Sequence, residues 1–232
     1  MGHYLVIAAS STIGQEVVRE LEVKGHSVFT TARDQSKIIP DIVLDASDFQ
    51  AVEEVFEKAG SIDGVVNCSG SLLLRPAHLT SKQQFEGMIN SCLTTAFATV
   101  RGAGKSMKQG GSVVLISSAA ASIGLAHHDA VAAAKAGVNG LMLSAAATYA
   151  HLNLRFNTVS PGLVETHLTK DIVQNEAARK VSEGMHGLGR LGKPQDVARA
   201  IVFLLEPENN WITGQILCVD GGLSTLKLRP KL

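Results

Sequence analysis

Short, almost purely apolar runs recur along the chain and are bounded by glycine, serine or charged residues. Such runs are typical of strands that are buried on both faces of a parallel sheet. Between them lie longer stretches whose apolar residues recur at helical spacing, as Val17, Val18 and Leu21 do. The alternation of the two patterns predicts an α/β fold, with helices covering both faces of a doubly wound parallel sheet.

The pattern predicts seven strands and several helices. The predicted strands are Tyr4–Ala9, His26–Thr31, Ile42–Leu44, Ile62–Val66, Val113–Ile116, His151–Val159 and Trp211–Gly222. The predicted helices are Gln15–Lys24, Phe49–Lys58, Lys82–Met107, Asp129–Ala150 and one that opens with Pro194 in its first turn. Only Asp34–Asp41 separates the second strand from the third, so we expect the crossover helix there to be missing or reduced to one turn.

Composition narrows the class of protein. Lys and Arg together number 21, as do Asp and Glu, so the charge balance indicates neither a nucleic-acid-binding surface nor an acidic tail. The three cysteines, Cys68, Cys92 and Cys218, lack metal-ligand spacing, and we interpret them as reduced thiols of a cytoplasmic protein without a metal site. We find no secretory signal and no apolar run of the ~20 residues that span a bilayer. The expectation is one soluble domain over residues 1–232.

The fifth predicted strand and the helix after it carry the clearest chemical pattern. The strand ends in two serines, and the Ala-rich helix has Lys135 in its second turn. This arrangement resembles the short-chain dehydrogenase/reductase family, whose catalytic residues are a Ser at this strand end and a Tyr-x-x-x-Lys on this helix. Ser118 and Lys135 stand where the family has its Ser and Lys, whereas Val131 stands in the place of the Tyr.

The resemblance covers Tyr4–Leu223 and implies a Rossmann fold that binds a nicotinamide dinucleotide. In the family, the turn after the first strand reads Thr-Gly-x-x-x-Gly-x-Gly, and here Ile7, Ala8, Thr12 and Gly14 hold those four places. The hydroxyl groups in this turn can still donate to phosphate, and the helix N-terminus offers free N–H groups. A positive φ at Thr12 would count against the site. The residues expected around the pyrophosphate are Ser10, Ser11, Thr12, Ile13 and Gly14.

Later strand ends carry the other cofactor contacts that the resemblance implies. Arg33 stands where NADP-preferring relatives have a base, so we expect NADP(H) over NAD(H), the alternative being a solvated surface Arg. Asp45 and Ala46 resemble the adenine-binding corner, while Asp48 is the better N-cap for the next helix. The family's Asn-Asn-Ala-Gly segment, on the ribose side, corresponds here to Asn67, Cys68, Ser69 and Gly70.

Two further segments match the family. Asn90 stands where an Asn helps to hold a water that connects the catalytic Lys to solvent; the alternative is a polar residue that kinks a packed helix. The family's Pro-Gly-x-x-x-Thr loop grips the nicotinamide carboxamide, and its residues here are Pro161, Gly162, Val164 and Thr166. We expect a substrate lid at about 165–190. Small residues on the outer faces of the two longest helices imply a homodimer or homotetramer.

The missing Tyr leaves two functions open. The first is an oxidoreductase that transfers a hydride between NADP(H) and a carbonyl or alcohol, with altered proton delivery, because a general acid contributes about 10²–10⁴ in rate. The second is a catalytically silent NADP(H)-binding or structural subunit of an oligomer.

Two histidines and an apolar set bear on the chemistry of the cleft. His127 and His128 are candidate replacement donors, although an N-cap at Asp129 would leave both in the preceding loop. The apolar residues expected around the cleft suggest a nonpolar substrate or simple packing; they are Leu72, Leu73, Leu74, Ile123 and Leu125.

Overall fold

The computed structural model describes residues 1–33 and 35–227 of the chain. Seven strands form one sheet in the order β3-β2-β1-β4-β5-β6-β7, and every neighbouring pair is parallel. The strands are β1 His3–Ile7, β2 Ser27–Ala32, β3 Ile42–Val43, β4 Gly64–Asn67, β5 Gly111–Ile116, β6 Leu154–Pro161 and β7 Ile216–Val219. The strand order reverses between β1 and β4, which is where open α/β sheets bind ligands at their carboxyl ends. The predicted doubly wound Rossmann fold is confirmed.

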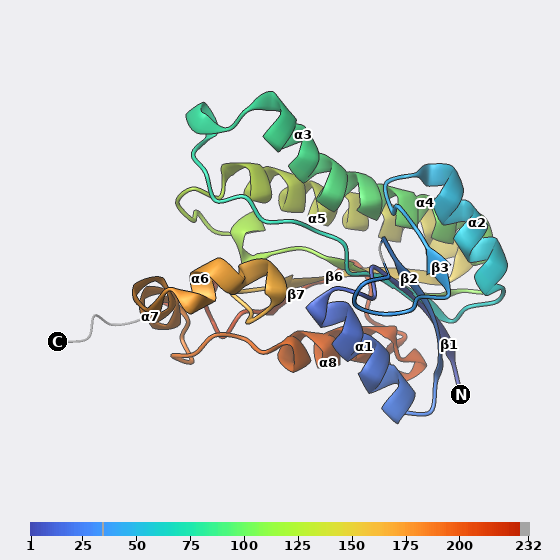
Figure 1. Cartoon of the computed structure of the whole chain (residues 1–232). Helices are drawn as coiled ribbons and strands as arrows, with labels where there is room; N and C mark the ends of the chain where they lie inside the picture. The colour runs from blue at the N-terminus through green and yellow to red at the C-terminus, as the bar shows by residue number, and fades with distance from the viewer. Residues whose placement is uncertain (34, 228–232) are drawn as a thin grey trace.

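Helices cover both faces of this sheet (Figure 1). One face carries α1 Thr12–Val23 and α8 Pro194–Leu205, whose buried residues pack with Tyr4 and Val6 of β1. The other carries α2 Phe49–Ala59, α4 Thr95–Ser106 and α5 Asp129–Tyr149. Leu5, on the next position of β1, belongs to the core on that side. Successive strand residues therefore enter different cores, as continuous apolar strands require.

Several element ends differ from the sequence expectation. β1 stops at Ile7 because Ala8 leaves the extended conformation, with φ 58°. β6 starts at Leu154 because the chain first makes a short 3-10 turn and a left-handed residue, Asn153. β7 is much shorter than predicted, since Trp211 is 96% exposed and the ladder begins only at Ile216.

The long helix expected at Lys82–Met107 is one helical path in three pieces. α3 spans Lys82–Ile89, a π turn spans Asn90–Thr94, and α4 follows. Each π bond reaches one residue further than an α-helical bond, so the wider turn changes the direction in which the next side chains point.

The short connection between β2 and β3 behaves as expected. Asp34 lies outside the described residues, and residues 35–41 contain no helix. Asp41 instead closes the connection, because its carboxylate accepts hydrogen bonds from the amide and the hydroxyl of Thr30, each at 2.7 Å. Residues 228–232 of the basic C-terminal tail also lie outside the described part.

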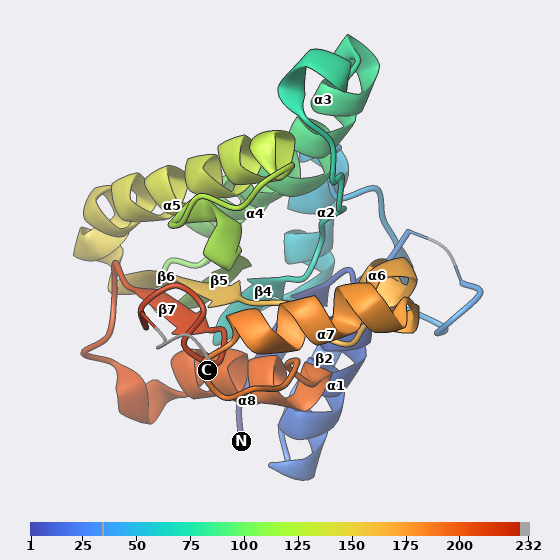
Figure 2. The same cartoon turned by 90° about the vertical axis from the view of Figure 1, so that its left-hand side faces the viewer.

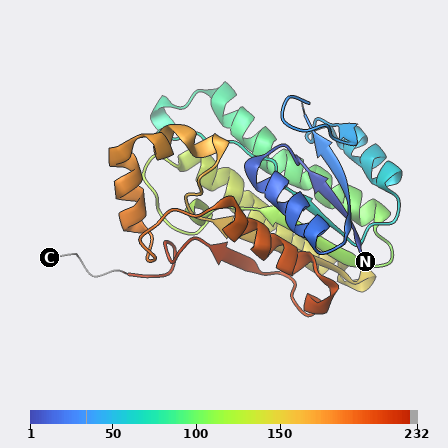
Figure 3. The same cartoon turned by 60° about the horizontal axis from the view of Figure 1, so that its bottom comes forward.

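Two helices follow β6 and its loop. α6 spans Lys170–Gln174 and α7 spans Glu176–Met185. Figure 2 shows them running across the front of the molecule, and Figure 3 shows them grouped at the end away from the N-terminus. The segment predicted as a lid is thus largely helical.

One described stretch, Asp129–Leu152, is long and apolar enough by length and composition to span a membrane. Half of that window is buried inside the fold, and Val138 and Met142 are fully buried in the core beside the sheet. Core helices of this kind pass the same composition test. The sequence expectation concerned uninterrupted runs, and Lys135 and Asn139 interrupt this one.

Candidate active site

The turn after β1 has the backbone shape of a phosphate loop. Ser11 caps α1, because its hydroxyl accepts a hydrogen bond from Gly14 N at 3.0 Å. Gly14 has no room for a side chain, since a Cβ would lie 2.7 Å from the carbonyl oxygen of Ala8. Among the described residues, the N–H groups of Thr12 and Ile13 at the helix start have no protein acceptor. Such groups are free to bind an anion.

The strained residue of this loop is Ala8, which corrects the concern about Thr12. Ala8 has φ 58°, in the left-handed region that favours glycine. Thr12 is the first residue of α1 and is not among the described residues with positive φ. The left-handed conformation costs an alanine about 1–2 kcal/mol relative to its preferred states. Ala8 therefore stands in the place of the family's first glycine and keeps a left-handed backbone conformation, which glycine favours.

Thr12 makes a contact that sequence reasoning missed. Its hydroxyl oxygen accepts a hydrogen bond from the amide of His167 at 3.2 Å, across 155 positions of the chain. His167 begins the 3-10 turn that leads into α6. Ser10, in the same loop, accepts from the side chain of Gln15 through its carbonyl oxygen. The start of the predicted lid is thus tied to the phosphate loop.

The residues expected on the adenine side lie beyond β2 and β3. Asp48 caps α2 as predicted, accepting from Gln50 N and Ala51 N. Asp45 is not left unbound, because its Oδ1 accepts from both the amide and the hydroxyl of Ser47. These bonds, and to a smaller extent the charge of Arg33, lower the pKa of Asp45. Arg33 is exposed beside this carboxylate.

Ala46, next to Asp45, is partly buried and packs against the core under α2. It offers no polar side-chain atom, so its contribution to a ligand site is limited to its backbone.

Asn67, at the end of β4, is buried with both ends of its amide satisfied. Its Nδ2 donates to the Thr99 hydroxyl on α4 at 2.9 Å, and its Oδ1 accepts from Ser69 N at 2.8 Å. The Asn67 side chain thus joins β4 to α4 and shapes the loop that follows. Gly70, in that loop, lies against the key lysine: a Cβ there would be 3.4 Å from Lys135 Nζ.

Cys68 is partly buried in the same loop. Desolvation raises the pKa of its thiol to about 12, and the nearby positive charge of Lys135 opposes this only in part. The thiol therefore stays protonated at neutral pH and serves as a small packing group.

Lys135 and the two serines meet at the carboxyl end of β5. Lys135 is only 6% exposed, and its Nζ donates to the carbonyl oxygen of Ile116 at 2.8 Å. Ser117, which sequence reasoning did not select, binds the Lys135 carbonyl oxygen through its hydroxyl at 3.2 Å. Ser118 accepts from Ala120 N at 3.2 Å, which leaves its own hydroxyl proton available to donate. These hydrogen bonds hold the end of β5 against α5 at Lys135, the residue that carries the positive charge.

Val131 faces an apolar cluster one turn before Lys135. It is 3% exposed and shares the cluster with Met88, Cys92, Ala120, Ala130 and Ala134. Of the predicted apolar set, Leu72, Leu73 and Leu125 pack against this cluster, whereas Leu74 is exposed and Ile123 lies outside it. At the position of the family's Tyr, this chain therefore has a buried Val side chain that packs against apolar neighbours.

The two candidate replacement donors lie before α5, as expected, but for a different reason. The N-cap residue is His128, and Asp129 is the first residue of the helix. The Asp129 carboxylate instead accepts from Ala77 N at 3.1 Å. The ring of His128 bonds the carbonyl oxygen of Ala126 through Nδ1, and His127 is exposed with φ 65°.

Asn90 is exposed and begins the π turn between α3 and α4, where its carbonyl oxygen accepts from Thr95 N. The π turn that begins at Asn90 interrupts the α-helical pattern, and a role of Asn90 toward a water beside the catalytic Lys stays a prediction.

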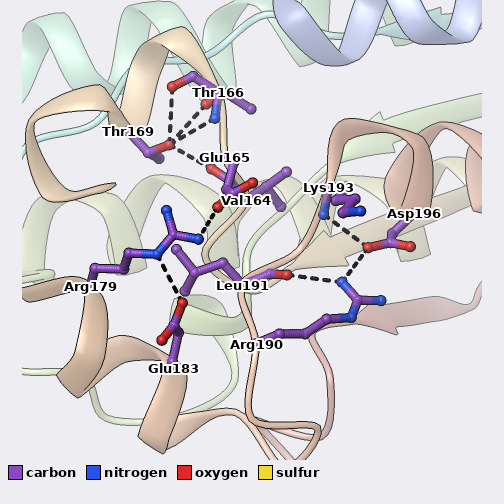
Figure 4. A network of polar contacts seen from close by, with 10 residues as sticks. All are labelled: Val164, Glu165, Thr166, Thr169, Arg179, Glu183, Arg190, Leu191, Lys193 and Asp196. Carbon is purple, nitrogen blue, oxygen red and sulfur yellow. Dashed lines mark hydrogen bonds and ion pairs between the residues drawn. The ribbon is translucent and has the colours of Figure 1, made fainter. Parts of the chain in front are cut away.

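The loop after β6 is held by several polar contacts, drawn in Figure 4. Pro161 ends β6, and Val164 is buried and bridges to Gly192. Thr166 does not point free into a cleft, since its hydroxyl and amide both bond the hydroxyl of Thr169 at 3.1 Å.

Charged groups also hold this loop and the segment before α8 that pairs with it through Gly192. Arg179 on α7 bridges Glu165 in the loop and Glu183 on its own helix (Figure 4). Asp196, in the first turn of α8, accepts from Arg190 at 2.7 Å and from Lys193 N at 2.9 Å, and the bond from Arg190 lowers its pKa. Pro194 is the first helical residue, as predicted.

A protein-family profile described as "Enoyl-(Acyl carrier protein) reductase" matches residues 7–224. A tropinone reductase homologue from Arabidopsis thaliana is 30% identical over 240 residues, covering 95% of this chain and 92% of the relative. The 3-oxoacyl-[acyl-carrier-protein] reductase FabG of Vibrio harveyi is 32% identical over 241 residues, covering 94% and 96%.

Solved structures agree with these relatives. A short-chain type dehydrogenase/reductase from Mycobacterium ulcerans matches with a TM-score of 0.91 at 27% identity, covering 96% of this chain and 90% of the other. The structure of ElxO with NADP bound matches with a TM-score of 0.90 at 29% identity, covering 97% and 100%. The chain belongs to the short-chain dehydrogenase/reductase family.

Proposed function

We propose that this chain is an oxidoreductase that transfers a hydride between NADP(H) and a carbonyl or alcohol substrate, without a tyrosine as proton donor. The observation that carries the proposal is the placement of Lys135. Its ammonium group is buried at the carboxyl end of β5, beside the backbone of Gly70, and uses one donor on Ile116 O. A Lys has three donors, so two remain for the hydroxyl groups of a ribose.

The residues present fit a dinucleotide. The left-handed turn at Ala8, the close packing at Gly14 and the unpaired amides of Thr12 and Ile13 supply an anion cradle at the N-terminus of α1. The carboxyl end of β4 leads to Gly70, which is exposed and lies beside Lys135 Nζ. Pyrophosphate would be held at the first place and the nicotinamide ribose at the second.

The bound cofactor supplies the hydride. Ser118 would donate a hydrogen bond to the substrate oxygen, since its own oxygen is already oriented by Ala120 N. The proton that completes the alcohol would come from water, because Val131 supplies none. Lys135 orients the ribose and places its positive charge near the reacting oxygen. Val131 offers neither donor nor acceptor, and the apolar cluster around it favours a nonpolar substrate.

The preference for NADP(H) rests on Arg33, whose exposed guanidinium can pair with a 2′-phosphate. ElxO, a structural neighbour, carries NADP, and a variant of ElxO with one tyrosine changed to phenylalanine carries NADPH and matches at a TM-score of 0.89. Binding of this cofactor therefore does not require every tyrosine of such a fold. We also propose that the chain acts in the cytoplasm as one domain, with residues 165–190 as lid. The small residues of α4 and α5 support assembly as a homodimer or homotetramer through these helices.

The burial of Val131 favours a second candidate, a catalytically silent NADP(H)-binding subunit. Such a subunit would bind the cofactor in the same cradle and would turn over no substrate.

The first experiment is a titration of the purified chain with NADPH and with NADH, followed by cofactor fluorescence. We expect NADPH to bind more tightly, and Lys135→Met to weaken binding about 10–100-fold, the value of hydrogen bonds from a charged donor. The matched control is Lys108→Met, because Lys108 also donates to a backbone carbonyl, that of Gly104, far from the cradle in sequence. Unchanged affinity in Lys135→Met would refute the proposed site.

A panel of ketones and alcohols then separates the two candidates. NADPH oxidation with a nonpolar ketone supports the oxidoreductase, whereas tight binding without turnover supports the silent subunit. Converting His127 and His128 to Gln tests them as donors, and unchanged turnover removes them from the mechanism.

A further inference from the structure

His186 is the most deeply buried histidine of the described chain. It follows α7 as its C-cap residue and is 3% exposed, although α7 itself has no buried residue. Its ring lies against the loop after β6: a Cβ on Gly162 would be 2.6 Å from Nε2 and 3.1 Å from the Cα of Asp220. The absence of a side chain at Gly162 makes room for the imidazole.

Both ring nitrogens are engaged. The amide of Leu163 donates to Nε2 at 3.1 Å, so Nε2 must carry a lone pair. Nδ1 lies 2.6 Å from the carbonyl oxygen of Ser182, which can only accept, so Nδ1 must carry the proton. The two bonds together fix the neutral Nδ1–H tautomer.

We propose that His186 is a positioning residue: it holds the backbone of Leu163 and Val164 in the conformation that would grip the nicotinamide. The inference rests on the proposed function, because that loop is the one assigned to the nicotinamide carboxamide. His186 touches no reacting atom and acts through the loop.

The rest of the loop shows why this bond matters. Gly162 N bonds Val219 O, Gly192 N bonds Leu163 O, and Glu165 N bonds Gly192 O. The amide of Leu163 lies between these anchors and has His186 as its acceptor. Arg179, on α7, forms an ion pair with Glu165 of this loop. α7 and its C-cap residue therefore contact the loop at two points, the amide of Leu163 and the carboxylate of Glu165.

Asp220, which follows β7, is the carboxyl that faces the ring. Burial raises the pKa of this carboxyl, but the hydrogen bonds from Ser224 and Gly222 outweigh burial and lower it. On α7 itself, Glu183 is already paired with Arg179.

The test uses two variants of similar size. His186→Leu keeps an apolar body in the pocket and removes the acceptor, whereas His186→Gln keeps an acceptor that does not titrate. In the cofactor-free protein, we expect amide hydrogen exchange in residues 161–166 to be about tenfold faster in His186→Leu and near wild type in His186→Gln. The dissociation constant for NADPH should follow the same order.

Imidazole ¹⁵N NMR of the wild-type protein gives a readout that needs no variant. We expect the Nδ1–H tautomer at neutral pH; the Nε2–H tautomer would overturn the proposal, as would equal exchange in the Leu and Gln variants. If the wild-type protein binds no NADPH, the proposed function fails, while the exchange data on the cofactor-free chain still decide whether His186 holds the loop.

Discussion

Two of the places where the chain departs from the family pattern differ in kind. At Ala8 the family's glycine is replaced, yet the backbone keeps the left-handed conformation, with φ 58°. At Val131 the family's tyrosine is replaced, and the new side chain joins an apolar cluster. In the first case the backbone shape is kept at an energetic cost; in the second the packing is satisfied and the hydroxyl of the proton donor is absent.

The difference shows what each position contributes. A phosphate loop works through backbone amides, so it tolerates a methyl group as long as the path of the chain is kept. A proton donor works through one side-chain atom, which a hydrocarbon cannot replace. The loss of glycines from the motif is therefore weak evidence against cofactor binding. The loss of the tyrosine hydroxyl is stronger evidence against the usual proton transfer.

The largest expected effect comes from restoring the hydroxyl. We expect Val131→Tyr to raise ketone reduction by about 10²–10⁴-fold, the usual contribution of a general acid. Steady-state NADPH oxidation measures it. Val131→Phe is the matched control, because it fills the same space without the hydroxyl; an equal gain in Phe would mean that packing, and not proton transfer, limits the rate.

The phosphate loop offers the next test. Gly14→Ala places a methyl group 2.7 Å from Ala8 O and 2.9 Å from the Cα of Ala9, both backbone atoms that cannot swing away. We expect a loss of about 1–3 kcal/mol in the free energy of unfolding, measured by urea denaturation. Gly87→Ala on α3, where nothing lies within 4 Å, should be neutral or stabilising. Equal effects at both positions would contradict the crowding argument.

A smaller gain is expected from relieving Ala8. Glycine removes a left-handed penalty of about 1–2 kcal/mol and adds about 0.4–1 kcal/mol of chain entropy to the unfolded state. Ala8→Gly should therefore stabilise the fold by roughly 0.5–1 kcal/mol, measured by urea denaturation. Ala9→Gly, at a buried residue outside the left-handed set, should destabilise it. A destabilised Ala8→Gly would show that the loop is not strained.

The smallest effect concerns the hydroxyl at Thr12. Thr12→Ala removes the acceptor for the amide of His167, a partly exposed bond worth about 0.5 kcal/mol. We expect hydrogen exchange in residues 167–174 to become about twofold faster. Thr12→Ser retains the hydroxyl oxygen, so its exchange rate in these residues should match that of the wild type. If Thr12→Ser exchanged as fast as Thr12→Ala, the hydrogen bond would not hold the start of the lid to the loop.

Much of the fold could be predicted from the sequence because buried parallel strands leave continuous apolar runs. β7 was predicted too long because Trp211 and Ile212 carry the same apolar signal, although Trp211 is almost fully exposed. The site was predictable where one residue type is needed, as at Lys135 and Gly14. It was not predictable where geometry arises between distant segments: no local pattern joins Thr12 to His167 or His186 to Leu163. The conformation of Ala8 is likewise invisible, since alanine is the residue least expected to mark a left-handed turn.

The two-residue strand β3 has a consequence at the rim of the sheet. Exposed strand edges invite other chains to extend the ladder, and long flat edges are the usual starting points of aggregation. Ile42 and Val43 offer too few backbone groups to template a further strand. The described residues before β3 contain no crossover helix, and the sheet ends there in a two-residue strand. Such an edge gives the strands of other chains little backbone to pair with.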